Sequence, residues 1–519
     1  MAGFRKTVMW VDDEIEMLRA HVMFLETRGY HVIPVFTGDD AIQLISEKPL
    51  EYDIVLLDEQ MPGKDGLTTL EEIKEIRPEL PVVMVTKSEE ERLMEQAIGK
   101  KIDGYLTKPV NPSQILLVCK RLLESKTFIA SEIKQQFLRS YSENTTALRG
   151  RLETQQWIKL HEILSRWDDK LDKIEDEGLR QTHAGQKSDS NTAFALFIEE
   201  NYGRWIKGES KPPALSVNVL QRHVFPLIAA QQQVCLIDCS GMRLDQYFCI
   251  EEALRPYFVI QRNCFYSVLP TDTVFARSSL LSGAFSLEVE ENFPDAWDID
   301  PRNHEKAIPF EMKLLKFNLQ KSGIKIGNSL YYTHLSEAHS IEAELAKHGK
   351  TRLVVIISDA LRTLAQGSGS TLLAPEIARD ERTLRSITRT WFEHSTLFRI
   401  LKDFSRKKCT VVLVSDHGTV FCTRKTELYG AKQLEHGVRY KFGKQITADD
   451  RRVVLLNDPQ HFKLPRLKRA QSCLIAKDNY YFVQPEGSRE QHLENRNSFQ
   501  QGGISLDEMI LPLAVLNPL

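Results

Sequence analysis

The sequence predicts an α/β protein in which two α/β domains flank a helical segment. Two observations support this fold class. Apolar strand-like runs alternate with helical patterns up to about residue 123 and again beyond residue 205, whereas the stretch between them lacks strand signals. A chain of 519 residues is also too long for one hydrophobic core. We therefore expect domains at residues 1–123, 124–205 and 206–519.

Composition narrows the class of protein. The 68 Lys and Arg residues nearly balance 71 Asp and Glu, which excludes a strongly basic nucleic-acid coat protein but not a local basic groove. The start has no pattern of a signal peptide, so we expect none, and no apolar run approaches the roughly 20 residues of a membrane span. The eight Cys residues lack a paired CxxC pattern. We expect a reduced, cytoplasmic protein without a membrane span.

Five apolar runs define the first α/β domain: TVMWV, HVIPVF, DIVLLD, PVVMVT and GYLTKP. Segments with helical spacing, such as GLTTLEEIKEIR, separate these runs, as expected for βαβ units around a parallel sheet. Sheets of this kind bind ligands at the carboxyl ends of their strands. The residues that follow the runs are therefore the candidates for a site.

Polar residues with complementary chemistry stand at these strand ends: Asp12, Asp13, Asp58, Thr86 and Lys108. A cluster of carboxylates needs a hard divalent cation such as Mg²⁺, and one carboxylate can then accept a phosphoryl group as an aspartyl phosphate. A lysine can neutralise the phosphoryl oxygens, and a threonine hydroxyl can donate a hydrogen bond to them. Any one of these acids alone would be interpreted as a helix cap. The ordered set favours a phosphorylation site.

The motifs VDDE, LLDEQMPGKDG, VTKS and YLTKPV resemble the response-regulator receiver domain of two-component signalling, over residues 5–123. The resemblance implies a flavodoxin-like, doubly wound fold, with Asp58 as the phosphoacceptor. It also implies an Mg²⁺ site formed by Asp12, Asp13, Asp58 and the carbonyl of Gln60. Thr86 and Lys108 would contact the phosphoryl group, and Tyr105 would change rotamer on activation. A sensor histidine kinase would be the phosphodonor, and phosphorylated receivers would pair as a homodimer.

Residues 126–205 have the pattern of charged amphipathic helices, with a polar interruption expected at THAGQKSDSN, residues 182–191. We interpret this segment as a small helical bundle or spacer. A DNA-binding helical module is the alternative, but the charges are mixed in sign and form no basic stripe.

Acidic residues also end three apolar runs of the last domain. Asp238 ends QQVCLID, Asp359 ends RLVVIISD, and Asp416 with His417 follows CTVVLVS. Thr273 lies in LPTDTVFARSSLLSG, between a proline turn and a probable helix. Asp, Thr and His suit Zn²⁺, which can activate a threonine oxygen, and a second metal would stabilise the leaving oxygen of a phosphoryl transfer. Capped turns are the alternative for each residue alone.

The motifs GMRLDQ, PTDTVFAR, WFEHS, SDHGT and QGGISLDEMILP resemble the PglZ domain of the alkaline-phosphatase superfamily. Together with the receiver and the helical segment, the whole chain resembles the PorX regulators of Bacteroidota type IX secretion. The resemblance implies a metal held by Asp238, Asp416 and His417 with Thr273 as bridging nucleophile, and Thr271 as the alternative. Its implied partners are the type IX secretion machinery and an extracytoplasmic-function sigma factor.

The second metal site departs from the superfamily pattern. Asp359 is present, but Thr363 and Gln501 stand where the superfamily has histidines, and both side chains bind Zn²⁺ more weakly than imidazole. We therefore expect one Zn²⁺ in this domain, or two if other residues complete the second site. His304, His394 and His492 could substitute, but we interpret each as a packed or surface histidine.

Two functions remain open at this point. The first is a phosphorylation-controlled regulator whose last domain engages partners, and the second adds zinc-dependent hydrolysis of phosphodiesters, with nucleotides or oligonucleotides as substrates. The basic run KLPRLKRAQ, residues 463–471, could guide a phosphate chain, but a solvated loop is the preferred interpretation. Cys235 and Cys239 are expected to pack within a strand.

Overall fold

The computed structural model describes residues 6–87, 102–295, 297, 300, 303–327, 329–335, 351–366, 378–430, 437–467, 470–484 and 495–519, with backbone only for 124–130. The chain divides into two compact units, Met1–Gln136 and Phe137–Leu519, and each is considered by itself. Among the described residues, no helix is both long and apolar enough to cross a membrane.

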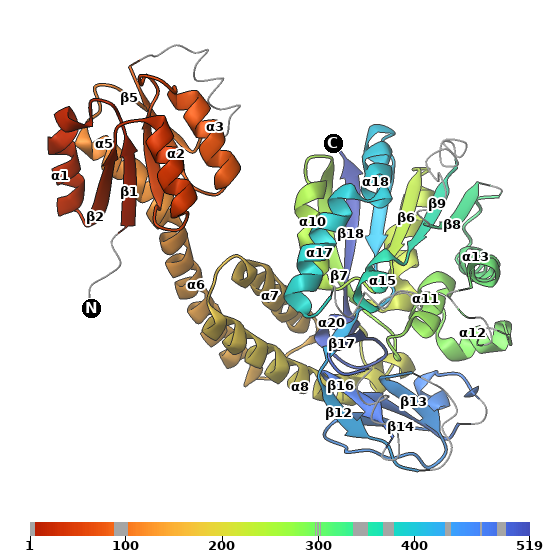
Figure 1. Cartoon of the computed structure of the whole chain (residues 1–519). Coiled ribbons are helices and arrows are strands. Elements are labelled where there is room, and N and C mark those ends of the chain that lie inside the picture. Colours follow the sequence, from red (N-terminus) through yellow and green to blue (C-terminus); the bar gives the residue numbers. More distant parts are fainter. Residues whose placement is uncertain are drawn as a thin grey trace. The chain divides into compact units, whose positions relative to one another are not determined.

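The described strands of the N-terminal unit form a five-stranded parallel sheet in the order β2-β1-β3-β4-β5 (Figure 1). The strands are β1 (Lys6–Val11), β2 (Tyr30–Val35), β3 (Ile54–Asp58), β4 (Val82–Thr86) and β5 (Gly104–Thr107). The described helices are α1 (Arg19–Thr27), α2 (Gly38–Glu47), α3 (Gly66–Ile76) and α5 (Pro112–Cys119). Val8 and Trp10 pack on one face with α1 and α5, and Met9 and Val11 pack on the other with α2 and α3. The predicted doubly wound α/β fold is confirmed.

Side-chain caps fix where the helices of this unit begin. Thr37 accepts a hydrogen bond from the Asp40 amide at the start of α2, and Asp65 accepts one from Thr68 at the start of α3. Asn111 forms a capping box at the start of α5. These caps orient the helices that follow the strand ends, where the candidate site lies.

The helical segment consists of α6 (Ser125–Leu148), α7 (Thr154–Asp172) and α8 (Glu177–Lys207), of which α6 crosses the boundary between the two units. The polar interruption expected at residues 182–191 is wrong, because these residues lie within the continuous 31-residue helix α8. Several of their polar side chains are buried against charged partners rather than exposed. Lys187, for example, contacts Asp168 and Glu381 at 3.0 and 3.1 Å.

A second sheet organises the rest of the chain, and its described strands have the order β7-β18-β10-β6-β9-β8. The four strands β10, β6, β9 and β8 are parallel, and β18 runs antiparallel to both β10 and β7. The strands are β6 (Val234–Cys239), β7 (Phe258–Tyr266), β8 (Leu330–His334), β9 (Leu353–Ser358), β10 (Thr410–Val414) and β18 (Ile510–Pro518). The parallel strands thus bring their carboxyl ends to one edge.

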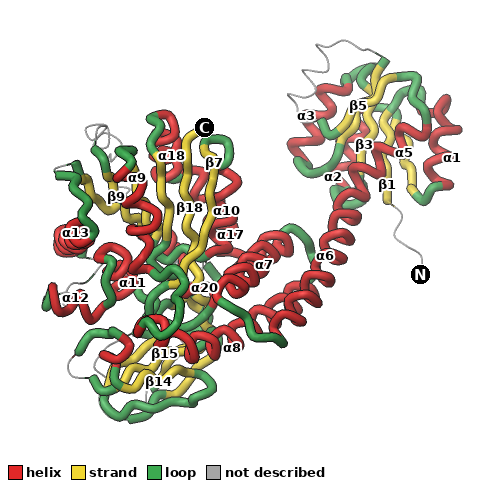
Figure 2. The backbone as a smooth tube through the Cα atoms, turned by 180° about the vertical axis from the view of Figure 1, so that it is seen from behind, coloured by secondary structure: helices red, strands yellow, loops and turns green. Residues whose placement is uncertain are grey.

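Helices cover both faces of this sheet (Figures 1 and 2). One face packs against α10, α17 and α18, and the other against α9, α11 and α13. The helices are α9 (Phe225–Ala229), α10 (Leu244–Leu254), α11 (Thr273–Ser282), α12 (Ser286–Asn292), α13 (His304–Lys321), α15 (Ala360–Gln366), α17 (Glu381–His394), α18 (Thr396–Arg406) and α20 (Leu506–Met509). This three-layer arrangement agrees with the predicted α/β domain.

Short strands form the remaining part of the C-terminal unit. They pair as β11 with β17, β12 with β16, and β13-β15-β14. Their bounds are β11 (Val420–Cys422), β12 (Arg424–Glu427), β13 (Tyr440–Gly443), β14 (Val453–Asn457), β15 (Ser472–Ala476), β16 (Tyr480–Val483) and β17 (Ser498–Gln500).

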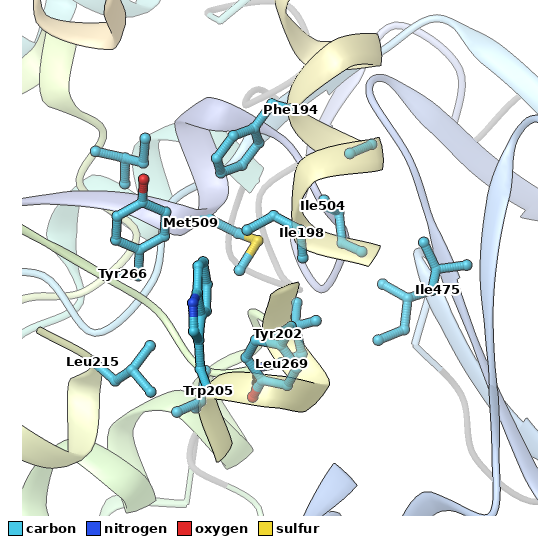
Figure 3. Close-up of a cluster of buried hydrophobic side chains, with 14 of the residues drawn as sticks. Phe194, Ile198, Tyr202, Trp205, Leu215, Tyr266, Leu269, Ile475, Ile504 and Met509 are labelled. Atoms are coloured by element: carbon cyan, nitrogen blue, oxygen red, sulfur yellow. Dashed lines mark hydrogen bonds between the residues drawn. The ribbon is translucent and has the colours of Figure 1, made fainter. Parts of the chain in front are cut away.

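One hydrophobic core joins α8 to this unit, as Figure 3 shows. Phe194, Ile198 and Trp205 of α8 are at most 5% exposed and share the cluster with Tyr266 of β7 and Ile475 of β15. Helix α8 is therefore part of the hydrophobic interior of the C-terminal unit.

Candidate functional site

The predicted acidic residues of the N-terminal unit meet at the carboxyl edge of its sheet. Asp12 follows β1 and Asp58 ends β3, and both are buried. Carboxylate oxygens of Asp12, Asp13 and Asp58 all lie within 4.8 Å of one another. Lys108 Nζ lies 2.8 Å from Asp12 Oδ2 and 2.9 Å from Asp58 Oδ2. One ammonium does not balance three carboxylates, so this donor set fits a hard divalent cation.

The charges of this site are strongly coupled. Burial raises the pKa of Asp58, and the ammonium of Lys108 opposes the rise. Burial also disfavours the charge on Lys108, but its hydrogen bonds to Asp12 and Asp58 outweigh this and raise its pKa. Lys108 therefore stays protonated and favours the ionised, nucleophilic form of Asp58.

The other predicted receiver residues lie around this cluster. Thr86 ends β4, is buried, and its hydroxyl donates a hydrogen bond to the Glu59 carboxylate. Gln60 is exposed in the bend after β3, and Tyr105 is partly buried in β5. Gly66 is required at the start of α3, because a Cβ there would lie 2.3 Å from the carbonyl oxygen of Asp58.

The predicted residues of the C-terminal unit also come together. Asp238 lies in β6, Asp416 and His417 follow the adjacent strand β10, and Thr273 is the first residue of α11. The Asp416 amide donates to Asp238 Oδ1 at 2.9 Å, and His417 Nδ1 lies 2.7 Å from Asp416 Oδ1. Thr273 Oγ1 lies 3.5 Å from His417 Nε2. All four side chains are buried.

Arg277 is a site residue to which the sequence reasoning assigned no role. Its Nε lies 3.1 Å from Asp416 Oδ2 and 3.3 Å from Asp238 Oδ2, and Nη2 donates to Asp359 Oδ1 at 2.9 Å. Arg277 lies four residues after Thr273 on α11, and residues four apart share a helix face. This spacing could have indicated that Arg277 lies near Thr273 in the site. The guanidinium supplies positive charge among the carboxylates of this site.

The pKa values of the two strand-end acids, Asp238 and Asp416, are shifted in opposite directions. Burial and the charge of Asp416 hold the pKa of Asp238 well above its usual range, against the opposing influence of Arg277. Burial disfavours the charge on Asp416 as well, but His417 and Arg277 outweigh it and lower its pKa to about 2. Asp238 Oδ2 accepts no hydrogen bond from the described residues. A buried oxygen of this kind, beside a histidine and a second carboxylate, fits a Zn²⁺-type cation.

Gln501 binds residues of this first site. Its Oε1 lies 2.6 Å from His417 Nε2, and its Nε2 donates to Thr273 Oγ1 at 3.2 Å. Both nitrogens of the His417 ring therefore face acceptors. Burial opposes a charge on the ring, but Asp416 outweighs it and raises the pKa of His417.

Two residues considered for the second site lie one helical turn apart. Asp359 directly follows β9, and its carbonyl accepts a hydrogen bond from the Thr363 amide at 2.9 Å, while Thr363 is exposed on α15.

Thr271, the alternative nucleophile, donates to the carbonyl oxygen of Gly503 at 2.7 Å, so its hydroxyl is engaged away from His417. This geometry favours Thr273 over Thr271 as the nucleophile candidate.

The remaining candidates have different surroundings. His394 is exposed at the end of α17, and His492 lies outside the described residues. His304, which we interpreted as a packed or surface histidine, has its Nε2 3.7 Å from Asp359 Oδ2. The buried Cys235 and Cys239 lie within β6 and pack in the core, as expected.

The basic run at residues 463–471 lies partly outside the described residues. Within its described part, Lys463 Nζ lies 4.9 Å from the centre of the Phe285 ring, and the Arg466 guanidinium lies 3.8 Å from the Glu291 carboxylate. These contacts engage both cations on the surface of the protein.

Comparison with known proteins identifies three regions. Residues 8–120 match the response regulator receiver domain family, 127–206 the PorX response regulator linker domain, and 372–516 the BREX system PglZ alkaline phosphatase-like domain. The chain is thus a response regulator with a receiver domain and a PglZ output domain. The three families occur in the order receiver, PorX linker and PglZ, which matches a PorX-type response regulator.

Individual relatives match the receiver region. The transcriptional regulatory protein ResD of Bacillus subtilis (strain 168) is 36% identical over 118 residues, covering 22% of this chain and 47% of ResD. Two-component system protein A of Emericella nidulans is 33% identical over 115 residues, covering 22% and 17%. The chain therefore spans less than half the length of these curated relatives.

Among solved structures, the receiver domain of NtrX from Brucella abortus is 31% identical, with a TM-score of 0.21, covering 22% of this chain and 98% of that one. A CheY-like receiver domain protein from Methanospirillum hungatei JF-1 is 27% identical, with a TM-score of 0.22, covering 23% and 95%.

A receiver domain implies a histidine kinase as partner.

Proposed function

We propose that a sensor histidine kinase phosphorylates this regulator on Asp58 and that the phosphorylated protein controls type IX secretion through its PglZ domain. The observation that carries this proposal is the buried Asp58 carboxylate, with Lys108 Nζ 2.9 Å from Oδ2 and two further acids beside it. The match to the PorX linker family supports the secretion role.

The receiver residues can perform the transfer as follows. A carboxylate oxygen of Asp58 forms a bond to phosphorus, while the bond from phosphorus to the donor's histidine nitrogen breaks. Lys108 neutralises charge on the phosphoryl oxygens, and the Thr86 hydroxyl exchanges its hydrogen bond to Glu59 for one to the phosphoryl group. Mg²⁺, when held by Asp12, Asp13, Asp58 and the Gln60 carbonyl, would supply further charge neutralisation.

Phosphorylation would then change the quaternary structure and the partners of the protein. Receiver faces would pair in a homodimer, with Tyr105 changing rotamer, and the helical linker would pass the change to the PglZ domain. The proposed location is the cytoplasm. The proposed partners are an extracytoplasmic-function sigma factor and components of the secretion machinery.

The test is phosphodonor-induced dimerisation with acetyl phosphate and Mg²⁺, measured by light scattering after size exclusion. Asp58→Ala is expected to abolish both the covalent phosphate and the dimer. Asp39→Ala, which removes an exposed acid on α2, is the matched control and should dimerise normally. Normal dimerisation of the Asp58 variant would show that the receiver account is wrong.

A second candidate function is metal-dependent hydrolysis of phosphodiesters in nucleotides or oligonucleotides. Its support is the position of Thr273 Oγ1 beside His417, together with the buried Asp238 Oδ2 that accepts no hydrogen bond from the described residues. Zn²⁺ at this site would supply Lewis-acid activation of the threonine oxygen. Thr273→Val should abolish hydrolysis of a chromogenic phosphodiester, whereas Thr271→Val should retain it. Absence of activity in the unaltered protein would leave the PglZ domain as a binding module.

A further inference from the structure

Two histidines outside the superfamily pattern meet the second-site acid Asp359. His304 begins α13, His334 ends β8 and Asp359 follows β9. One ligand atom from each lies within 4.8 Å of the other two. His304 Nε2 is 3.7 Å from Asp359 Oδ2, and His334 Nδ1 is 3.8 Å from the same oxygen. The two imidazole rings are 4.6 Å apart between centroids.

The His334 ring is oriented by a carboxylate behind it. Its side chain is only 2% exposed, and Nε2 lies 2.5 Å from Glu311 Oε2, which also accepts a hydrogen bond from the Tyr332 hydroxyl at 2.9 Å. A carboxylate in this position accepts a hydrogen bond from Nε2–H, so the proton stays on Nε2 and the lone pair is on Nδ1. Metal-binding histidines in proteins are held in the same way.

The free nitrogen of His334 points to the other two ligands. Nδ1 is buried and has no hydrogen-bond partner among the described residues. Its distance of 3.8 Å from Asp359 Oδ2 is too long for a hydrogen bond. A merely packed histidine would leave this buried nitrogen unsatisfied, which is energetically unfavourable. A cation between the three ligands would satisfy it.

Asp359 presents one particular oxygen to the histidines. Arg277 Nη2 donates to Oδ1 at 2.9 Å, and Arg362 Nε lies 3.5 Å from the same atom. Oδ2 is therefore the oxygen that faces both imidazoles. Ligand atoms around tetrahedral Zn²⁺ are about 3.3 Å apart when the bonds are about 2.0–2.1 Å. Closing distances of 3.7 and 3.8 Å to this value requires shifts of only a few tenths of an ångström.

We propose that His304 Nε2, His334 Nδ1 and Asp359 Oδ2 bind a divalent cation of the Zn²⁺ class, with Glu311 positioning His334. Two imidazoles and one carboxylate leave a fourth position for water or a phosphate oxygen, and His304 is the half-exposed member of the set. This set supplies the imidazoles that Thr363 and Gln501 do not. The site is defined by metal binding, so it does not depend on hydrolysis by Thr273 or on phosphorylation of Asp58.

The test measures Zn²⁺ binding to the full chain by isothermal titration calorimetry and elemental analysis. His304→Ala is expected to lower the number of bound Zn²⁺ ions by one, and His394→Ala, which removes an exposed histidine at the end of α17, should leave it unchanged. Glu311→Gln is expected to weaken binding at this site about 10- to 100-fold. The absorption spectrum of the Co²⁺-substituted protein gives a second readout of the same ligands.

Two outcomes would overturn the proposal. One is wild-type stoichiometry and affinity in His304→Ala, and the other is an anomalous difference map of the Zn²⁺-soaked protein without a peak among the three ligands. Failure here is distinguishable from failure of the proposed functions. Asp58→Ala and Thr273→Val should both keep this Zn²⁺, and His304→Ala should still dimerise with acetyl phosphate.

Discussion

Gly418 illustrates how single residues hold the C-terminal site together. It follows His417 directly, and a Cβ at this position would lie 1.9 Å from the carbonyl oxygen of Asp507. The clash is with backbone, which cannot rotate away as a side chain can. The segment around Asp507 therefore approaches the turn after β10 only because residue 418 has no side chain.

We expect Gly418→Ala to destabilise the C-terminal unit by about 1–3 kcal/mol or more, because overpacking a close contact forces the backbone to shift. Gly185→Ala is the matched control. It lies in α8 with open space around its Cβ position, and the change should stabilise the helix by about 0.5–1 kcal/mol. Urea unfolding monitored by tryptophan fluorescence measures both. Equal stabilities of the two variants would contradict the close approach at Gly418.

The helices α7, α8 and α17 meet at a set of charges that lines a partly open pocket of about 320 Å³. Lys187 of α8 contacts Asp168 of α7 at 3.0 Å and Glu381 of α17 at 3.1 Å. The ammonium has lost most of its hydration, yet Asp168, Asp507 and Glu381 raise its pKa. Lys187 thus connects helices α7, α8 and α17 through charge pairs.

Lys187→Met should destabilise the C-terminal unit by about 3–5 kcal/mol, because it removes one of the cations that pair with these buried carboxylates. Lys173→Met removes an exposed lysine that pairs with Asp169 at 2.7 Å on α7, and it should cost less than about 1 kcal/mol. Thermal unfolding of the two variants side by side gives the comparison. A Lys187 variant as stable as the Lys173 variant would mean that the buried charges contribute little.

The ionisation of Asp507, which lies beside Lys187 and Arg243, should make the stability of the C-terminal unit depend on pH. Burial, with additional repulsion from Glu381, raises its pKa to about 6 although Arg243 and Lys187 oppose the rise. Asp507 lies 3.7 Å from Arg243 and 3.9 Å from Lys187, and its Oδ1 accepts no hydrogen bond from the described residues. The folded state therefore binds this proton more tightly than the unfolded chain, whose aspartates titrate near about 3.9.

Asp507 therefore stabilises the folded state more at low pH than at high pH. Between about pH 4 and pH 6 the folded state holds more protons at Asp507, so this residue's contribution falls as pH rises and is lost above about pH 6. The loss amounts to about 3 kcal/mol for a shift of roughly two pKa units. Asp507→Asn should remain uncharged and should be more stable than the wild type at pH 7.5 but not at pH 4. Parallel stability curves for the two proteins from pH 4 to 7.5 would contradict the shift.

Parts of this organisation were predictable from the sequence for a physical reason. Asp58, Asp238 and Asp416 lie at the ends of strongly apolar runs, and parallel strands must bring such ends to one edge. His334 carries no comparable local signal, because its role depends on Glu311 from another element. The stretch 182–191 misled the prediction because polar composition normally indicates exposure, whereas Lys187 and its neighbours face buried charges.

The helical segment does not form a separate unit of its own, because its helices are divided between the two compact units. Helix α6 crosses the boundary between the two compact units at residue 136, whereas α7 and α8 belong to the second unit. Phe194, Ile198 and Trp205 of α8 lie in the same core as residues of β7 and β15. Each of these large side chains stabilises a folded domain by about 1.5–3 kcal/mol when fully buried.

This packing predicts where the chain can be divided. A fragment of residues 137–519 keeps its core and should fold and unfold cooperatively, without responding to acetyl phosphate.

A fragment of residues 206–519 begins at the domain boundary expected from the sequence, but it lacks α7 and α8. Losing three large core side chains removes a substantial part of the roughly 5–15 kcal/mol that stabilises a typical domain. It also exposes the apolar groups that covered them, so this shorter fragment should aggregate or unfold. Solubility, circular dichroism and thermal unfolding of the two fragments test the prediction. A stable, cooperatively folded fragment 206–519 would show instead that the PglZ domain is independent of the linker helices.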